Sequence, residues 1–143
     1  DLFKFGQTHD FHYCKSKKLK AFHKSCLTWD FLNLIEEITN VKFKGTLSMS
    51  ASLYKKTNFL LPHDDKLEDR KITYLYYLSD LNKKEGGGFN IYKTKNNLPT
   101  KIEKTLQPEF NSLLLFKVQK NSFHEVAEIL SDKPRYTIGG WIA

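Results

Sequence analysis

The sequence predicts a mainly β domain, a sandwich or jelly-roll barrel, with one helical segment toward its amino terminus. Three observations lead to this prediction. Short segments rich in β-branched and aromatic residues recur after residue 46, and one of them alternates polar and apolar residues. Turn-forming residues separate these segments, and a helical period occurs only before them. Many short strands after a leading helix are typical of sandwiches and jelly rolls.

The helical segment is expected at residues 28–38. Thr28 is a favourable N-cap residue at its start. Apolar residues at helical spacing form one stripe along it: Phe31, Leu34, Ile35 and Ile38. Residues 1–28 mix polar and aromatic side chains without a clear period, so no second helix is predicted.

The strands follow. Residues 47–54 alternate apolar side chains with serines, which is the period of a half-buried strand. Residues 70–78 are apolar or aromatic on both faces, as in a strand buried between two sheets. Further strands are expected at residues 89–92, 113–118, 123–126 and 136–143, separated by turns at residues 80–84, 86–88, 96–99 and 131–134.

Length and composition limit the classes of protein that the chain can belong to. A chain of 143 residues with 40% hydrophobic residues predicts one globular domain, residues 1–143. Because no initiator Met is present, we expect this domain to be excised from a longer chain. No apolar run is long enough to span a bilayer, so no membrane contact is expected. Two cysteines make no disulfide framework, which favours an intracellular location, cytoplasmic or nuclear.

The net charge of +7 has two interpretations. Lysines are spread widely, which favours a solubilising surface. One cluster, at residues 15–24, is the alternative: a patch that contacts the ribosome or RNA.

A metal site is predicted from three side chains. His63 and Asp65 are two residues apart, and on a strand such residues project from the same face. His124 is the only other histidine in the strand-rich region. Two histidines and one carboxylate leave three metal positions open, which is the facial arrangement of non-haem Fe(II) oxygenases.

A cosubstrate site is predicted beside the metal. Arg135 follows His124 after a turn and is expected to begin the neighbouring antiparallel strand. On that strand Arg135 shares a face with Thr137, Gly139 and Trp141. An inward guanidinium with a glycine beside it can grip the far carboxylate of a dicarboxylic acid through two hydrogen bonds.

These motifs together resemble the ribosomal-protein prolyl hydroxylases, which are 2-oxoglutarate oxygenases of the prolyl-hydroxylase branch. The resemblance runs along nearly the whole chain. It is carried by residues 1–8 (DLFKFGQT), 60–65 (LLPHDD), 70–78 (RKITYLYYL), 85–88 (EGGG), 123–126 (FHEV) and 135–138 (RYTI).

The resemblance implies a double-stranded β-helix fold that requires Fe(II), 2-oxoglutarate and O2, with ascorbate as reductant. It implies hydroxylation of a proline in a small-subunit ribosomal protein, at C3. The metal ligands would be His63, Asp65 and His124, and Arg135 would bind the C5 carboxylate of 2-oxoglutarate. Further cosubstrate-binding positions follow from the resemblance or from the shared strand face: Tyr54, Tyr77 and Thr137. Eukaryotic members also carry a second, non-catalytic domain, for which this chain has no room.

Three alternatives remain open. The first is a catalytically silent jelly-roll binding module, although all three ligands and the arginine are present. The second keeps the chemistry but changes the substrate to an elongation factor or a transcription factor, since specificity depends on loops and pocket shape. The third is a zinc site near the amino terminus, without the paired-cysteine spacing of a zinc ribbon. Its ligands would come from His9, His12, Cys14, His23 and Cys26.

Overall fold

The computed structural model describes residues 2–67 and 69–143. Asp1, the first residue of the family-like amino-terminal segment, and Glu68 lie outside the described residues. Within them the chain forms two helices and ten strands. The helices are α1 (Lys17–Cys26) and α2 (Trp29–Thr39). The strands are β1 (Phe3–Lys4), β2 (Gly6–Gln7), β3 (Ser50–Tyr54), β4 (Phe59–His63), β5 (Ile72–Tyr77), β6 (Phe89–Lys95), β7 (Leu98–Leu106), β8 (Leu113–Lys117), β9 (His124–Val126) and β10 (Arg135–Ile142).

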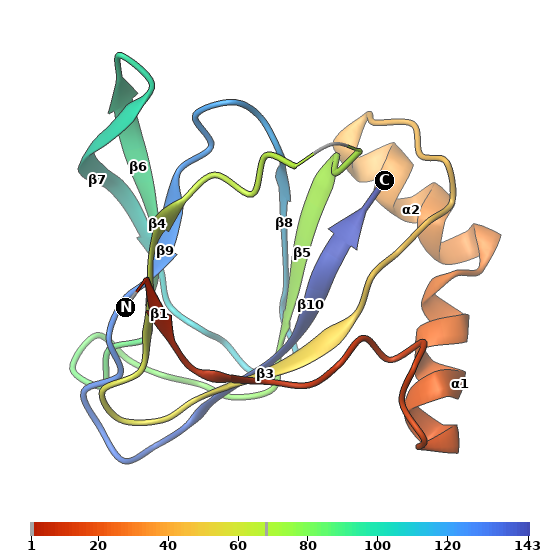
Figure 1. The fold of residues 1–143 in the computed structure, drawn as a ribbon, viewed down its shortest axis with the longest axis horizontal. Coiled ribbons are helices and arrows are strands. Elements are labelled where there is room, and N and C mark those ends of the chain that lie inside the picture. Colours follow the sequence, from red (N-terminus) through yellow and green to blue (C-terminus); the bar gives the residue numbers. More distant parts are fainter. Residues whose placement is uncertain (1, 68) are drawn as a thin grey trace.

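The strands form two five-stranded antiparallel sheets that face each other (Figure 1). One sheet has the order β1-β4-β9-β6-β7 and the other the order β2-β3-β10-β5-β8. Most consecutive strands alternate between the sheets, which is the winding of a jelly roll. The predicted fold class is therefore confirmed.

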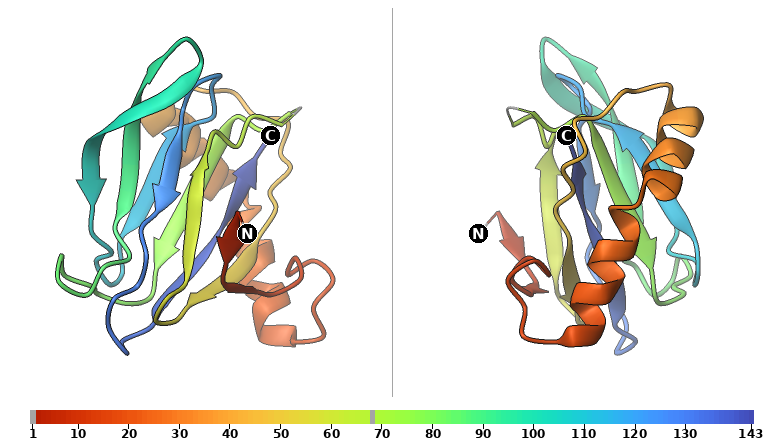
Figure 2. Two further views of the ribbon diagram at one scale, coloured as in Figure 1. Left: turned by 60° about the vertical axis from the view of Figure 1, so that its left-hand side comes forward. Right: turned by 90° about the vertical axis from the view of Figure 1, so that its right-hand side faces the viewer.

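The two helices cover the outer face of the β2-β3-β10-β5-β8 sheet (Figure 2). Their apolar side chains and that face form the larger core, which includes Phe11, Leu32, Ile35, Met49, Ile72, Tyr74 and Ile142. Strand β5 is thus buried on both faces, as expected. One of its faces packs against the helices, however, and not against a second sheet as the sequence predicted. Its other face looks into the space between the sheets, where Thr73 and Leu75 line a cavity and Tyr77 contacts Arg135.

Helix α2 starts where it was predicted, but it packs through a different face. Thr28 is the N-cap, and its hydroxyl accepts a hydrogen bond from the amide of Phe31 at 3.5 Å. Leu32 and Ile35 are buried, whereas Leu34 and Ile38 are 50% and 61% exposed. The predicted apolar stripe is wrong for these two residues, because the helix carries apolar residues around much of its circumference and the period does not select one face.

Helix α1 was not predicted. Ser16 caps it by accepting a hydrogen bond from the amide of Leu19 at 3.3 Å. Four of its ten residues are lysines, and the inward positions are Leu19, His23 and Cys26. Because one of these three is a histidine, the sequence shows no apolar period strong enough to predict the helix.

Strands β1, β2 and β7 were also missed. Strand β7 carries mostly exposed Lys, Thr and Glu and forms a hairpin with β6 through Asn96 and Asn97, both with positive φ. Strands β1 and β2 form a strap that joins the two sheets: Phe3 pairs with Leu60 in one sheet and Gly6 with Leu53 in the other. The strap closes one side of the space between the sheets.

Candidate active site

Neighbouring strands bring the two predicted histidines together. His63 ends β4, His124 begins β9, and the two residues lie directly opposite each other in the antiparallel register. Their ring centroids are 4.2 Å apart. The ring of His124 stacks on Phe89 and meets the edge of Phe116, so apolar packing fixes its orientation.

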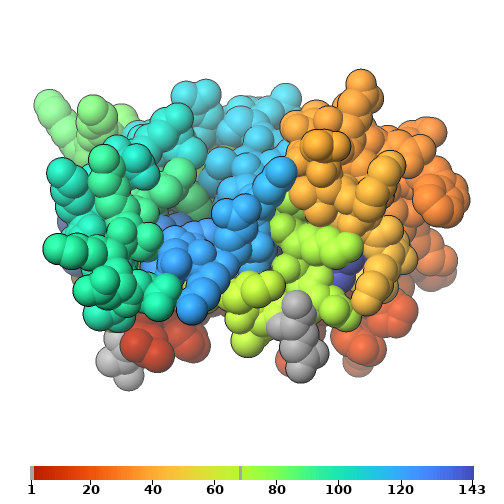
Figure 3. Space-filling model, turned by 90° about the horizontal axis from the view of Figure 1, so that it is seen from above, coloured from red at the N-terminus to blue at the C-terminus, as the bar shows by residue number. Residues whose placement is uncertain are grey.

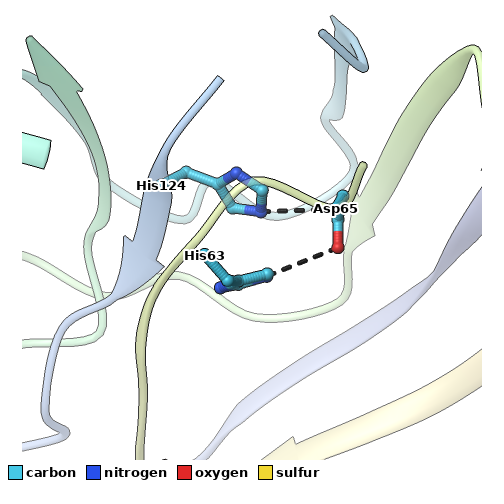
Figure 4. A group of neighbouring side chains, drawn as sticks. All are labelled: His63, Asp65 and His124. Atoms are coloured by element: carbon cyan, nitrogen blue, oxygen red, sulfur yellow. Dashed lines mark ion pairs between the residues drawn. The ribbon is translucent and has the colours of Figure 1, made fainter. Parts of the chain in front are cut away.

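Asp65 completes the group from a loop. Strand β4 ends at His63, and Asp65 has a positive φ of 58°, so the expected position on the same strand as His63 is wrong. The left-handed turn still directs the carboxylate back toward the histidines (Figure 4). Its Oδ1 lies 3.5 Å from Nε2 of His63 and its Oδ2 lies 3.4 Å from Nε2 of His124. The buried Thr73 hydroxyl donates a hydrogen bond to Oδ2 at 3.0 Å and holds the carboxylate in place.

Charge in this group is mutually stabilised. Burial raises the pKa of Asp65, but pairing with His124 and His63 outweighs burial and holds that pKa well below its usual range. For His63, burial lowers the pKa, but pairing with Asp65, the bond to the Leu61 carbonyl and the charge of Asp64 together more than offset burial, so the pKa is raised. The carboxylate is therefore an anion at neutral pH, and a proton on His63 competes with any metal for the same nitrogen.

The donor set fits a divalent iron. Nδ1 of His63 donates to the carbonyl of Leu61 and Nδ1 of His124 to the carbonyl of Ser122, both at 2.9 Å. A carbonyl can only accept, so these bonds leave the Nε2 lone pairs free for a metal. The ligating atoms of the two histidines and Asp65 all lie within 4.8 Å of one another. Two imidazoles and one carboxylate with open positions are the ligand set of non-haem Fe(II) oxygenases.

No second metal group of this kind is found in residues 2–67 and 69–143. The amino-terminal histidines and cysteines do not converge, so the zinc alternative is wrong. Cys14 and Cys26 are both free thiols.

Arg135 lies across the space between the sheets from the histidines. It begins β10, which pairs with β3 and β5 and not with β9, so the expected neighbouring position beside His124's strand is corrected. The side chain is 1% exposed, and no carboxylate lies within 4 Å of it in the described part of the chain. Its Nη2 donates to the Tyr77 hydroxyl at 3.5 Å, and its Nε is buried without a partner. A buried guanidinium without an anion is costly, which indicates that an anionic ligand binds there.

The other expected cosubstrate residues surround this guanidinium. The guanidinium carbon lies 5.1 Å from the ring centres of both Tyr54 and Tyr77, and Thr137 pairs with Tyr77 across the strands. All three residues are buried. Tyr54 and Thr137 line one cavity of about 300 Å³ with Arg135 and the His/Asp/His group, whereas Tyr77 is connected to it through its hydrogen bond with Arg135. Burial raises the pKa of Tyr54 and of Tyr77, although Arg135 lowers both, so each phenol keeps its proton at neutral pH and can donate it to an anion.

Several residues that sequence reasoning did not single out also shape the cavity. Phe5, from the strap, stacks on Tyr54 at 4.5 Å and lines the cavity wall. Thr73 and Arg70 reach Asp65. The guanidinium carbon of Arg70 also lies over the Trp141 ring, 3.4 Å from its centroid. Thr73 lies on the same strand face as Tyr77, and this spacing could have identified it as a site residue. No local pattern in the sequence pointed to Phe5.

The fold and site together define a non-haem Fe(II) oxygenase of the jelly-roll class. The family model of the 2OG-Fe(II) oxygenase superfamily matches residues 49–143, and the chain belongs to that superfamily. No helix among the described residues is long and apolar enough to cross a membrane.

Curated relatives agree with the resemblance inferred from the motifs. The chain is 39% identical to the prolyl 3-hydroxylase OGFOD1 of Xenopus laevis over 144 residues, covering 99% of this chain and 28% of the relative. It is 31% identical to the prolyl 3-hydroxylase sudestada1 of Drosophila melanogaster over 150 residues, with 99% and 28% covered. The chain thus spans little more than a quarter of the length of these relatives.

Solved structures agree on the fold. A prolyl-4-hydroxylase of Pseudomonas putida has a TM-score of 0.68 at 17% identity, covering 98% of this chain and 71% of that one. A Trichoplax adhaerens prolyl hydroxylase, solved with a peptide fragment of hypoxia inducible factor, has a TM-score of 0.67 at 22% identity, with 99% and 70% covered.

Proposed function

We propose that this chain is the catalytic domain of a prolyl hydroxylase that acts on a protein and uses Fe(II), 2-oxoglutarate and O2. Residues 1–143 would form this domain within a longer protein. The observation that carries the proposal is one cavity with a His/Asp/His group at one end and the uncompensated guanidinium of Arg135 at the other. In the reaction, prolyl C–H, 2-oxoglutarate and O2 give hydroxyprolyl, succinate and CO2.

His63, Asp65 and His124 would hold the iron. Their orientation is set before any metal binds, because backbone carbonyls fix both imidazoles and Thr73 fixes the carboxylate. Iron with bound 2-oxoglutarate supplies the O2 activation that the side chains themselves cannot perform. The residues of the chain contribute the ligand geometry and the cavity in which the cosubstrate is held.

Arg135, Tyr54, Tyr77 and Thr137 would bind 2-oxoglutarate. The guanidinium neutralises the far carboxylate and offers two parallel hydrogen bonds, and the protonated phenols are further donors. All four side chains are at most 3% exposed, so these bonds form in a low-dielectric environment where they are strong.

The substrate assignment rests on the relatives and the motifs. Relatives named prolyl 3-hydroxylase support a proline substrate and hydroxylation at C3. The motif resemblance supports a ribosomal protein as substrate, ascorbate as reductant and an intracellular setting. Contact with the ribosome or RNA through the lysine-rich surface belongs to the same proposal. The same chemistry on an elongation or transcription factor is the alternative, which only substrate tests distinguish.

The direct test incubates the protein with Fe(II), ascorbate, 2-oxoglutarate and a proline-containing ribosomal-protein peptide, and follows peptide mass and succinate. We expect a gain of one oxygen with matching succinate, abolished by His124→Ala. Succinate without peptide oxidation would keep the oxygenase and reject this substrate. If neither product forms and 2-oxoglutarate does not bind the iron-loaded protein, the proposal is wrong.

A further inference from the structure

A second, larger hollow adjoins the cavity. It has a volume of about 850 Å³ and shares two wall residues, Arg70 and Trp141, with the 300 Å³ cavity. Its remaining walls come from the segment before α1, the segment before β3 and the loop before β5. In Figure 3 the blue carboxyl-terminal residues are visible between the yellow-green loop and the orange-yellow segment. We call this hollow the flanking groove.

The flanking groove has an aromatic wall. Tyr13 is 78% exposed, and its ring meets the edge of the His12 ring at 4.9 Å. His12 in turn lies 6.3 Å from the ring of the buried His23, which bonds to the carbonyl of Leu47. A row of rings that ends in an exposed tyrosine is a surface suited to peptide contacts, because tyrosine offers a large area with few rotatable bonds.

The lining of the groove has more carboxylates than cationic side chains, in contrast to the chain as a whole. Its charged lining residues are Asp10, Asp69 and Arg70, whereas the whole chain carries a net charge of +7. Both oxygens of Asp10 accept backbone amides, those of His12 and Met49. Asp69 is 71% exposed and lies 3.6 Å from the Lys44 amine.

The one guanidinium in the lining does not neutralise these carboxylates. Arg70 lies over the Trp141 ring, and its Nη1 lies 3.9 Å from Asp65 in the metal group. Its charge is therefore directed toward the cavity. The pairing of Asp69 with Lys44 is between two exposed side chains and is therefore weak, so a cationic side chain of a bound peptide can replace Lys44 there. The carboxylates and the aromatic wall together attract a lysine or arginine side chain through charge and through the face of Tyr13.

We propose that the flanking groove binds the residues next to the target proline and selects a cationic side chain there. The proposal rests on the proposed function, since the groove is assigned to the same protein substrate. An extended peptide advances about 3.3 Å per residue, so a chain that leaves the mouth past Trp141 enters the groove within a few residues. Specificity would thus be determined outside the cavity that holds the iron and 2-oxoglutarate.

The test measures binding, which does not depend on turnover. Protein loaded with Mn(II) and 2-oxoglutarate is titrated into a fluorescent peptide of about twelve residues that has a central proline flanked by lysines. A second peptide replaces the lysines with glutamates. We expect Asp69→Lys to weaken binding of the lysine peptide by about five- to tenfold and to strengthen binding of the glutamate peptide. Tyr13→Ala should weaken binding of the lysine peptide.

A matched control and two arms make the test decisive. Asp132 is exposed, like Asp69, and is likewise paired with a lysine, Lys56, at 3.3 Å. It lies in the turn before β10, so Asp132→Lys should leave binding of both peptides unchanged. Improved binding of the glutamate peptide by Asp69→Lys also proves that this variant is folded. Equal affinities of the parent for both peptides, or an Asp69→Lys variant that behaves as the parent does, would overturn the inference. Displacement of the lysine peptide by a short single-stranded RNA would overturn it in favour of a nucleic-acid site.

Failure of the proposed function has a different signature. If neither peptide is hydroxylated but the charge preference is present, the groove is retained and the reaction assigned to the cavity is rejected. If the peptides are hydroxylated without a charge preference, the groove assignment is rejected and the enzyme is retained.

Discussion

At the scale of single residues, binding of 2-oxoglutarate in the cavity should depend on Arg135, whose buried guanidinium has no carboxylate partner among the described residues. Arg135→Ala should weaken 2-oxoglutarate binding by about a hundredfold or more, because a buried charge pair loses one partner, a loss of ~3 kcal/mol. Arg135→Lys should fall between the parent and the alanine variant, since it keeps the charge and loses the paired hydrogen bonds. Calorimetric titration of 2-oxoglutarate into Mn(II)-loaded protein measures both.

The control is Lys133→Ala, which removes a nearby cation that is half exposed and paired with Glu85. Its affinity for 2-oxoglutarate should equal that of the parent. An Arg135→Ala variant that binds 2-oxoglutarate as tightly as the parent would show that the anion site lies elsewhere.

The metal group predicts a pH dependence with a definite sign. The pKa of His63 is raised above its ordinary value of 6.5 in the metal-free protein. Its pairing with Asp65 therefore stabilises the metal-free fold fully below pH 6.5, and this contribution is lost as pH rises through the raised pKa. Metal binding needs the unprotonated ring, so affinity should fall as pH is lowered through that same pKa, by up to about tenfold per pH unit.

Calorimetric titration with Mn(II) at a series of pH values between 6 and 8 tests this expectation. His12→Ala, which changes an exposed histidine outside the metal group, should not alter the profile. A Mn(II) affinity that is the same across the series would contradict the assigned ligands.

Residue types and their spacing predicted most of the site residues but not how these residues are arranged in space. His63, Asp65, His124 and Arg135 were found from their order along the chain and from the family motifs. The left-handed backbone of Asp65 could not be predicted, because aspartate adopts that conformation only when its surroundings select it. The Thr73 hydroxyl on Asp65 and the Phe5 ring on Tyr54 are contacts between segments that local patterns cannot relate.

At the scale of elements, β10 is the central strand of its sheet and tolerates little change. A Cβ added to Gly140 would lie 2.1 Å from the carbonyl oxygen of Ser48, which is backbone and cannot move aside. Gly140→Ala should therefore lower the free energy of unfolding by about 2–3 kcal/mol. Gly6→Ala is the matched control, because its Cβ would meet Leu53 only at an ordinary 3.8 Å. Urea unfolding measures both, and equal losses would contradict this packing.

Helix α2 should act through one buried face. Ile35 is fully buried against the sheet, so Ile35→Ala should cost ~2–5 kcal/mol of unfolding free energy. Leu34→Ala, on the 50% exposed side, should change it by less than about 0.5 kcal/mol. A larger loss for Leu34→Ala than for Ile35→Ala in thermal or urea unfolding would contradict the observed buried face.

The elements differ in how well the sequence predicts them, for physical reasons. Strand β3 was recognised because serines alternate with apolar residues, and α2 because it has a cap and a period. Helix α1 and strand β7 were missed because lysines and other polar residues dominate both, so burial leaves little trace in either sequence. Strands β1 and β2 contain two residues each, which is too short for any period.

At the scale of the whole molecule, the order of strands determines what the site can do. Strands β9 and β10 follow each other in the chain but lie in opposite sheets. Arg135 therefore faces the histidines across the cavity instead of lying beside His124. That separation leaves room for an elongated dicarboxylate between the guanidinium and the metal group. Sheet order is a long-range property, which is why the sequence predicted the residues but placed this strand wrongly.

The surface beyond the cavity belongs to the same scale. The chain as a whole is basic, whereas carboxylates outnumber cations in the lining of the flanking groove. Selection among protein substrates by charge would therefore take place in this groove, beside the cavity. The chain covers little more than a quarter of its curated relatives, so further selection by the remainder of a longer protein is compatible with this arrangement.

The most direct test of the central claim is the origin of the oxygen atom in the product. The protein is supplied with Fe(II), 2-oxoglutarate, ascorbate and a proline peptide under isotopically heavy O2, and peptide and succinate are analysed by mass spectrometry. We predict one heavy oxygen on the proline for each succinate formed, with the second heavy atom in the succinate, and neither product with His124→Ala. An unlabelled hydroxyproline, or a peptide that remains unoxidised while no succinate forms, would contradict the assignment of this site.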